Sequence, residues 1–126
     1  MSLEEDLYAI EEGFWLRGQD HFVAHVDDKC LLAFPLMGEM HGVHSRAEVA
    51  ATATMANRWR DLTMSRRHLL QPADGVAIIS YRADVKRADG LPYEALISSV
   101  YVRRSGGWKL AFHQHSPGEK AEGPAT

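Results

Sequence analysis

Four extended segments separated by short turns fill the second half of the chain, and this pattern constrains the fold more than any other feature. The segments are Leu62–Gln71, Val76–Arg87, Tyr93–Arg104 and Trp108–His115. The turns between them are Pro72–Gly75, Ala88–Gly90 and Ser105–Gly107, which supply the Pro, Asp, Ser and Gly residues that favour chain reversal. Consecutive strands joined by such short turns pair as hairpins, so we expect an antiparallel meander.

The sequence before these segments is mainly helical in pattern. Ser2 and Glu5 have the spacing of a capping box, which predicts a helix starting at residue 3 and ending near Gly18. Its apolar stripe is formed by Leu3, Leu7, Ile10 and Phe14, whereas the acidic residues Glu4, Glu5, Glu11 and Glu12 fall on the remainder. We therefore expect one face of this helix to pack on a core and those acids to face solvent.

Two further helices and one strand are expected before the meander. Asp20 is a candidate N-cap for a short helix over His21–Val26, and Ser45 with Glu48 repeats the capping-box spacing. The second box predicts a third helix from Arg46 to about Trp59. Between these helices, Cys30–Met37 has the composition of a buried strand, with Pro35 indicating an edge or a bulge because proline donates no ladder hydrogen bond.

Helices followed by a run of antiparallel strands predict an α+β fold, in which a curved sheet wraps over the N-terminal helices. A chain of 126 residues is the size of one domain, and we assign that domain to residues 1–117. The last ten residues contain two prolines, two glycines and no large apolar side chain. We accordingly expect residues 118–126 to form a mobile tail.

Charge and composition exclude several classes of partner. The 14 Lys and Arg residues are matched by 17 Asp and Glu, so the chain lacks the basic excess of a nucleic-acid-binding domain or a protein that binds anionic membranes. No uncharged stretch is longer than Cys30–Gly38, which is too short to span a bilayer. One cysteine cannot form an internal disulfide, and the N-terminus lacks a signal-peptide pattern, so we expect a cytoplasmic protein.

The two last segments carry a resemblance to a known family. The run Tyr93–Arg104, YEALISSVYVRR, leads into WKLAFHQHSP at Trp108–Pro117, and together with the order of elements it resembles the nuclear transport factor 2-like superfamily. The SnoaL-like branch and the association domains of calcium/calmodulin-dependent kinase II are the most similar. The resemblance implies a cone-shaped, cystatin-like α+β barrel, usually a homodimer, with a pocket between the helices and the concave sheet. Its members include isomerases, cyclases, hydrolases and non-catalytic domains, so the fold does not give the reaction.

Alternation along each strand predicts which side chains face the pocket. In the last strand, Gln114 shares a face with Trp108, Leu110 and Phe112, whereas His113 and His115 lie opposite. The more apolar sets of the other strands place Tyr81, Arg66 and His68 inside. The predicted ligand-binding residues are Phe14, Phe34, Trp59, Arg66, His68, Tyr81 and Gln114. Such an apolar cup with few polar groups is typical of a small-molecule site, and Arg66 would favour a carboxylate-bearing ligand.

Whether this pocket is catalytic is left open by the sequence. A cofactor-independent isomerase, cyclase or hydrolase would need a general base and an oxyanion donor, for which His68 and Tyr81 are the candidates. Tyr81 and Gln114 could equally satisfy each other or buried backbone groups. No carboxylate falls on an assigned interior position of a strand.

Histidine pairs raise the question of a metal. Of seven histidines, His21 and His25 have helical i, i+4 spacing, while His113 and His115 share a strand face. Both spacings can chelate zinc or copper, but no third ligand accompanies them at a matching spacing, so we assign no metal and no cofactor.

A third reading is a dimerisation or assembly domain. The expected outer face of the last strand carries Lys109, Ala111, His113 and His115, which would suit the rim of an isologous interface. The Tyr93–Arg104 segment is apolar on both faces and needs a partner on each. We therefore expect a homodimer.

Overall fold

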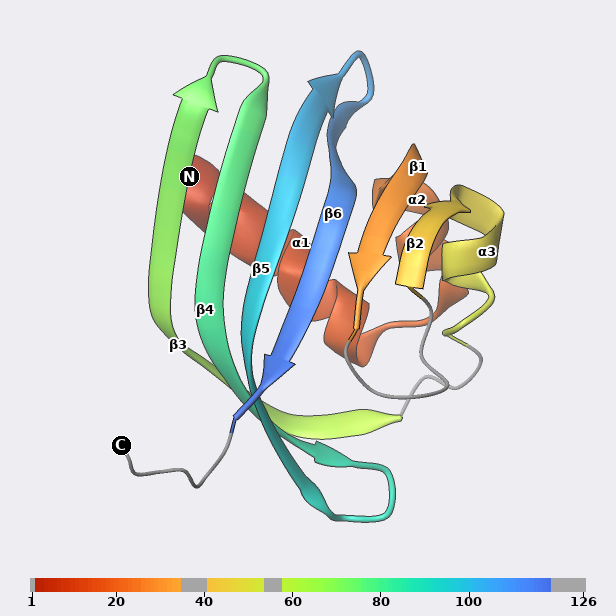
Figure 1. Cartoon of the computed structure of the whole chain (residues 1–126), viewed down its shortest axis with the longest axis vertical. Coiled ribbons are helices and arrows are strands. Elements are labelled where there is room, and N and C mark those ends of the chain that lie inside the picture. Colours follow the sequence, from red (N-terminus) through yellow and green to blue (C-terminus); the bar gives the residue numbers. More distant parts are fainter. Residues whose placement is uncertain (1, 35–40, 54–57, 119–126) are drawn as a thin grey trace.

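The helical half and the stranded half follow the expected order in the structure (Figure 1). The computed structural model describes residues 2–34, 41–53 and 58–118. The elements in chain order are α1 (Leu3–Leu16), α2 (Gln19–His25), β1 (Val26–Ala33), β2 (His41–Ser45), α3 (Arg46–Ala50), β3 (Trp59–Ala73), β4 (Val76–Arg87), β5 (Pro92–Arg104) and β6 (Gly107–Pro117). The protein is thus an α+β fold, and the meander of hairpins is confirmed.

Both predicted capping boxes are present. The Ser2 hydroxyl accepts from the Glu5 N–H at 3.1 Å, and the Glu5 carboxylate accepts from the Ser2 N–H at 3.2 Å. Ser45 and Glu48 make the same reciprocal pair at the start of α3. These bonds satisfy backbone donors that the first turn of a helix leaves unpaired, which explains why both helices begin where the sequence indicates.

Several element boundaries differ from the sequence prediction. The helix that begins at Arg46 ends at Ala50, and Trp59, expected near its end, is the first residue of β3. β2 was not expected, and β1 begins at Val26 rather than at Cys30. Gly18, not Asp20, caps α2. Residues 35–37, the end of the predicted Cys30–Met37 strand, lie outside the described residues, as does the predicted tail beyond residue 118.

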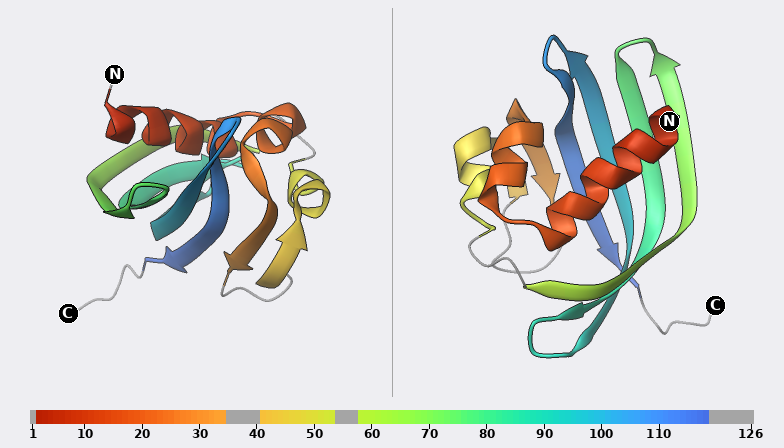
Figure 2. Two further views of the ribbon diagram at one scale, coloured as in Figure 1. Left: turned by 90° about the horizontal axis from the view of Figure 1, so that it is seen from above. Right: turned by 180° about the vertical axis from the view of Figure 1, so that it is seen from behind.

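The six strands form one strongly curved sheet in the order β2-β1-β6-β5-β4-β3 (Figures 1 and 2). All neighbours are antiparallel except β1 and β6, which are parallel. α1 crosses the concave face of the sheet, while α2 and α3 lie beside β1 and β2 (Figure 2). No helix in the described part of the chain is long and apolar enough to span a membrane.

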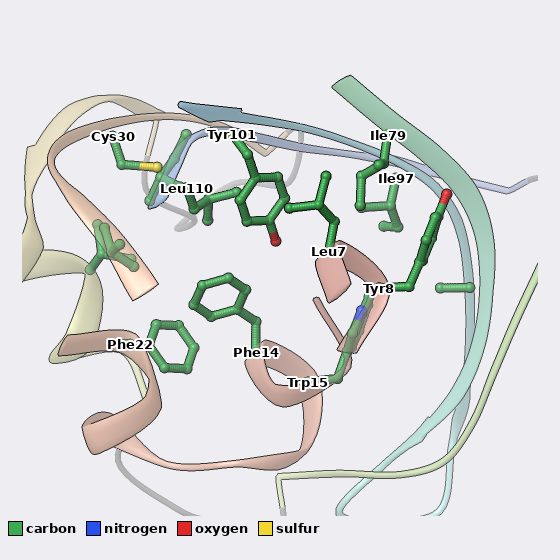
Figure 3. Packing of buried hydrophobic residues seen from close by; sticks show 14 of the residues in the cluster. Leu7, Tyr8, Phe14, Trp15, Phe22, Cys30, Ile79, Ile97, Tyr101 and Leu110 are labelled. Atoms are coloured by element: carbon green, nitrogen blue, oxygen red, sulfur yellow. The ribbon is translucent and has the colours of Figure 1, made fainter. Parts of the chain in front are cut away.

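The core lies between α1 and the concave face. Leu7, Tyr8 and Trp15 project from α1 toward Ile79 and Ile97 of the sheet (Figure 3). The inward set predicted for β4 is confirmed, since Ala77, Ile79, Tyr81, Ala83 and Val85 are all buried. Burial of this face removes apolar surface from water, which is the main stabilising contribution in a domain of this size.

A bulge in β3 places Arg66 and His68 in solvent, contrary to the sequence prediction. Ser65 pairs with Arg82 and His68 pairs with Ser80, so two residues of β3 oppose only Tyr81 of β4. Arg66 adopts the left-handed conformation within this bulge, at φ 52°. An extra residue reverses the facing of everything after it, and the interior position therefore passes from His68 to Leu69.

A second bulge in β6 reverses the predicted facing of its C-terminal half. Val100 of β5 pairs with Phe112 and Tyr101 pairs with Leu110, which leaves Ala111 as the extra residue. Beyond it, His113 pairs with the fully buried Ser99, whereas Gln114 pairs with Ser98 on the outer face. The prediction that Gln114 points inward is therefore wrong, and His113 and His115 face the interior instead of the outer surface.

Candidate functional site

A cavity of about 330 Å³ opens between the helices and the β1–β6 side of the sheet. Apolar and aromatic side chains make up most of its wall, and they come from every helix and from three strands. The lining residues are Phe14, Trp15, Phe22, Leu32, Phe34, Val49, Thr52, Arg58, Trp59, Leu110, His113 and His115. Phe14 and Phe22 face each other at this end of the core (Figure 3), with ring centroids 4.9 Å apart.

His115 is enclosed by aromatic rings. It stacks on Trp15 with ring centroids 5.2 Å apart, and Phe34 meets it edge-on at 4.8 Å. Trp59 packs in turn against Trp15 at 5.1 Å. These contacts fix the orientation of the imidazole and leave it in surroundings of low polarity.

Glu11 is the buried charge-bearing group of this region, with 0% of its surface exposed. Three hydroxyl groups donate to its carboxylate: Tyr81 to Oε2 at 2.9 Å, Ser99 to Oε2 at 2.8 Å and Tyr101 to Oε1 at 2.5 Å. Trp15 Nε1 donates to the Tyr81 hydroxyl at 2.8 Å and so orients it. A buried carboxylate is tolerated only with such a set of donors, so Glu11, β4 and β5 are held together as a unit.

A chain of hydrogen bonds connects Glu11 with the cavity. The Ser99 hydroxyl donates to Glu11, so the contact of 2.8 Å between Ser99 Oγ and His113 Nδ1 requires His113 Nδ1–H to donate. His113 Nε2 then accepts from His115 Nε2 at 3.0 Å. The other nitrogen of His115, Nδ1, accepts from the Tyr93 hydroxyl at 2.9 Å. Every member of the chain has one consistent role when both imidazoles are neutral and Glu11 is ionised.

Burial shifts the pKa values of Glu11, His113 and His115. Desolvation lowers the pKa of His113 to about 4 and, with help from His113 and Arg87, the pKa of His115 to about 2. Desolvation also raises the pKa of the Glu11 carboxyl, an effect that the Tyr101, Ser99 and Tyr81 donors oppose. Both imidazoles are thus neutral near pH 7, and the contact of 3.4 Å between His113 Nδ1 and Glu11 Oε2 is not an ion pair.

Of the seven ligand-binding residues predicted from the sequence, three line the cavity and four do not. Phe14, Phe34 and Trp59 line the cavity. Tyr81 is buried and bonded to Glu11 and Trp15, and it is absent from the described residues that line the cavity. Arg66 and His68 are exposed on β3, and Gln114 lies on the outer face of β6.

Glu11, His113 and His115 are not among the pocket residues predicted from the sequence. Glu11 was assigned to the solvent face because only Leu3, Leu7, Ile10 and Phe14 were counted as the apolar stripe. Including Tyr8 and Trp15, both buried, widens the stripe and places Glu11 near its centre, and this signal was present in the sequence. The inward turn of the two histidines depends on the Ala111 bulge, for which we find no sequence signal.

Within the described residues, the two histidine pairs are not part of a metal-binding cluster. His21 and His25 lie with ring centroids 4.4 Å apart, and His21 Nε2 is 2.8 Å from the Ile10 carbonyl oxygen. No group of three or more His, Cys, Asp or Glu side chains in residues 2–34, 41–53 and 58–118 is arranged to hold a metal ion.

Solved structures of similar architecture were found, although no protein-family model matches the sequence and no curated protein matches it significantly. A ketosteroid isomerase-like protein of Parabacteroides distasonis aligns with a TM-score of 0.72 at 18% identity, covering 94% of this chain and 89% of that one. A nuclear transport factor 2-like protein of Cytophaga hutchinsonii has a TM-score of 0.72 at 13% identity, covering 93% and 99%.

The association domain of calcium/calmodulin-dependent kinase II from C. elegans is also similar, with a TM-score of 0.66 at 11% identity over 89% of this chain and 90% of that one. At these identities the likeness concerns the fold, and function has to be argued from the site. The helical N-terminus, the six-stranded curved sheet and these neighbours agree with the resemblance seen in the sequence: this chain has the nuclear transport factor 2-like fold.

Proposed function

We propose that the protein binds a small, mainly apolar organic molecule in the cavity, with a polar group of that molecule against His113 and His115. The observation that carries this proposal is an aromatic cup in which the polar side chains of the described lining are Thr52, Arg58 and the two histidines. Its volume of about 330 Å³ is near the lower end of the range of roughly 300–1,000 Å³ that is typical of small-molecule sites.

The other two polar groups of the lining, the Arg58 guanidinium and the Thr52 hydroxyl, are less suited to binding a ligand than the histidines, because both donate to backbone carbonyl groups. Arg58 donates to the Phe14 carbonyl at 2.7 Å and to the Arg17 carbonyl at 3.0 Å. The Thr52 hydroxyl donates to the Val49 carbonyl at 2.7 Å. The histidine pair, in contrast, is joined by one contact of 3.0 Å between its two Nε2 atoms, and a polar group of a ligand can take the place of that contact.

Tryptophan fluorescence offers a direct test of binding. Trp15 and Trp59 line the cavity, so a Trp108→Phe background restricts the signal to the two cavity indoles. We expect a saturable change with at least one member of a panel of small aromatic and aliphatic alcohols, ketones and carboxylates. Thr52→Phe, at the cavity wall, should abolish the change, whereas Thr63→Phe, on exposed β3, should preserve it. Saturation that survives Thr52→Phe, or its absence for the whole panel, would contradict the proposal.

A second proposal is a homodimer formed through the convex face of the sheet. Ile78, Val100 and Phe112 are register partners in one row across β4, β5 and β6, and Leu96 is 56% exposed on the same face. The corrected facing of β6 thus puts an apolar row, rather than His113 and His115, on that surface. Contiguous apolar surface of this kind is typical of an isologous interface.

Light scattering after gel filtration tests the dimer. We expect the mass of two chains for the wild type and of one chain for Val100→Asp. Val23→Asp serves as the matched control because Val23 is 54% exposed on helix α2 and is not part of the sheet. A monomeric wild type, or a dimer unaffected by Val100→Asp, would refute this arrangement.

A further inference from the structure

The hydrogen bonds that connect Glu11 with the cavity through Ser99 and His113 can all point in either of two directions. With Glu11 ionised, Ser99 donates to Glu11, His113 Nδ1–H donates to Ser99, and His113 Nε2 is an acceptor. If Glu11 is protonated, its O–H can donate to Ser99 Oγ, and the Ser99 hydroxyl then donates to His113 Nδ1. A neutral His113 must in that case carry its proton on Nε2. The charge on Glu11 therefore determines whether Nε2 accepts or donates.

Only one part of His113 can meet a ligand. Its Nδ1 edge is turned to Ser99 at 2.8 Å and to Glu11 at 3.4 Å, inside the protein. The ring also lines the cavity, and its opposite edge carries Nε2, which lies 3.0 Å from His115 Nε2, so a ligand reaches this nitrogen by taking the place of that contact. A ligand in the cavity therefore meets His113 Nε2 as a donor or as an acceptor, according to the direction of the hydrogen bonds that run from Glu11.

We propose that Glu11 sets the hydrogen-bonding polarity of the cavity through Ser99 and His113, and that a carboxylate ligand is bound together with one proton, which resides on Glu11. A ligand hydroxyl or amine, which donates, suits the ionised state. A ligand carboxylate, which only accepts, suits the protonated one. This inference rests on the proposed function, since it names the ligand chemistry of the same cavity.

The proton balance needs no other reactant. A proton from solvent binds His113 Nε2, the proton on Nδ1 moves to Ser99 Oγ, and the former Ser99 hydroxyl proton moves to Glu11 Oε2. One N–H bond forms at Nε2 and one breaks at Nδ1, while Ser99 exchanges one O–H bond for another. Glu11 becomes neutral, and His113 ends as a neutral imidazole of the opposite tautomer. His115 keeps its proton on Nε2, so the contact between the two Nε2 atoms is replaced by the ligand carboxylate, which accepts from both N–H groups.

The surroundings of Glu11 favour this coupling. The groups that face it are hydroxyls of Tyr81 on β4 and of Ser99 and Tyr101 on β5, with His113 on β6. His21, on α2, interacts electrostatically with Glu11 and opposes the rise in the pKa of the Glu11 carboxyl, while burial lowers the pKa of His21 itself. A second anion in the cavity would therefore be repelled by ionised Glu11 in a medium of low polarity, and neutralising Glu11 removes that repulsion.

Calorimetry with 2-naphthoate and the neutral 2-naphthylmethanol tests the inference. Heats measured in two buffers of different ionisation enthalpy, over a series of pH values, give the number of protons taken up per ligand. We expect the wild type to take up about one proton with naphthoate once free Glu11 is ionised, and none with the alcohol. Over that range the Kd for naphthoate should rise by up to about tenfold per pH unit.

Variants separate Glu11 from the other groups. Glu11→Gln is a neutral isostere whose amide can donate to Ser99, so it should bind naphthoate without proton uptake and with a Kd independent of pH. Tyr101→Phe is the matched control, because Tyr101 donates to Glu11 outside the chain. It should keep the uptake, displaced to higher pH. Ser99→Ala should weaken the preference for naphthoate that the wild type gains as the pH falls, because it removes the hydrogen bonds between Glu11 and His113 and leaves the charge on Glu11.

Each outcome decides the inference. Uptake that persists in Glu11→Gln would assign the proton to the histidines and overturn it, as would naphthoate binding without uptake in the wild type. If the alcohol binds and naphthoate does not, the proposed binding function stands and this inference fails. If Glu11→Gln does not fold, infrared difference spectra of the wild type serve instead. A protonated-carboxyl band must then appear on adding naphthoate, and its absence would overturn the inference.

Discussion

The hydroxyl of Tyr8, on α1, lies inside the β3 bulge against the backbone of His68. It accepts from the His68 N–H at 3.1 Å and contacts the His68 and Ser80 carbonyl oxygens at 3.0 and 2.9 Å. A bulge leaves backbone groups without ladder partners, and this hydroxyl satisfies them. The helix thus stabilises an irregularity that turns the His68 side chain outward.

Removing this hydroxyl should destabilise the protein. Tyr8→Phe leaves buried backbone groups unsatisfied, and we expect the free energy of unfolding in urea to fall by about 1–3 kcal/mol. His68→Ala removes only an exposed side chain and should stay within about 0.5 kcal/mol of the wild type. Equal losses in the two variants would show that the side chain of His68, not its backbone, matters.

Backbone conformation at Arg66 makes a separate prediction. Its φ of 52° lies in the left-handed region, which β-branched residues tolerate poorly. Arg66→Ile should therefore cost about 1–2 kcal/mol of unfolding free energy, whereas Arg66→Gly should be much less harmful. Urea unfolding of both variants beside Arg67→Ile, at the neighbouring exposed site, provides the comparison. Similar losses at residues 66 and 67 would argue against strain.

The buried histidines should make the protein sensitive to mild acid. In the folded state the pKa of His113 is about 4 and that of His115 about 2, below the value of about 6.5 for an unfolded imidazole. The unfolded chain thus binds more protons, and the stability that these groups contribute is complete above pH 6.5 and is lost as the pH falls toward the folded values.

The raised pKa of Glu11 acts in the opposite sense, because its contribution is lost as the pH rises through the folded value. Replacing His115 isolates the histidine effect. His115→Phe keeps the aromatic packing and removes one titrating group, so it should reduce the acid-side slope of the urea midpoint against pH. An unchanged slope would contradict the assignment to His115.

Cys30 should be unreactive in the folded protein. Burial raises the pKa of its thiol to about 12, and the side chain is 1% exposed. Thiolate is the reactive form, so modification by Ellman's reagent at neutral pH should be slow in buffer and fast in denaturing urea. Because the chain contains a single cysteine, the reaction reports on opening of the core alone. Rapid modification in buffer would place Cys30 in a region that opens readily.

The sequence predicts those parts of this fold that local chemistry determines. Ser2 and Ser45 mark two helix starts because capping is complete within four residues, and the turns that separate the meander strands are set by their own Gly, Pro and Asp residues. The inward set of β4, including Tyr81, follows from unbroken alternation.

The candidate site was predicted less well, for a physical reason. Strand facing depends on every residue before it, so the bulges at Arg66 and Ala111 invert the assignments of His68, Gln114, His113 and His115. The β3 bulge is stabilised by a partner remote in sequence, the Tyr8 hydroxyl. Glu11 is buried for a similar reason, because the hydroxyls that satisfy it lie on β4 and β5.

The parallel pairing of β1 with β6 has a consequence for biosynthesis. β1 joins the sheet through residues such as Leu32 opposite His113, so the N-terminal third of the chain gains its place only when the last strand has been made. Until β6 leaves the ribosome, β1 and α1 have no completed surface to dock on, and contacts of such sequence separation form slowly. Nascent chains that end before β6 should accordingly bind chaperones and be cleaved readily by proteases.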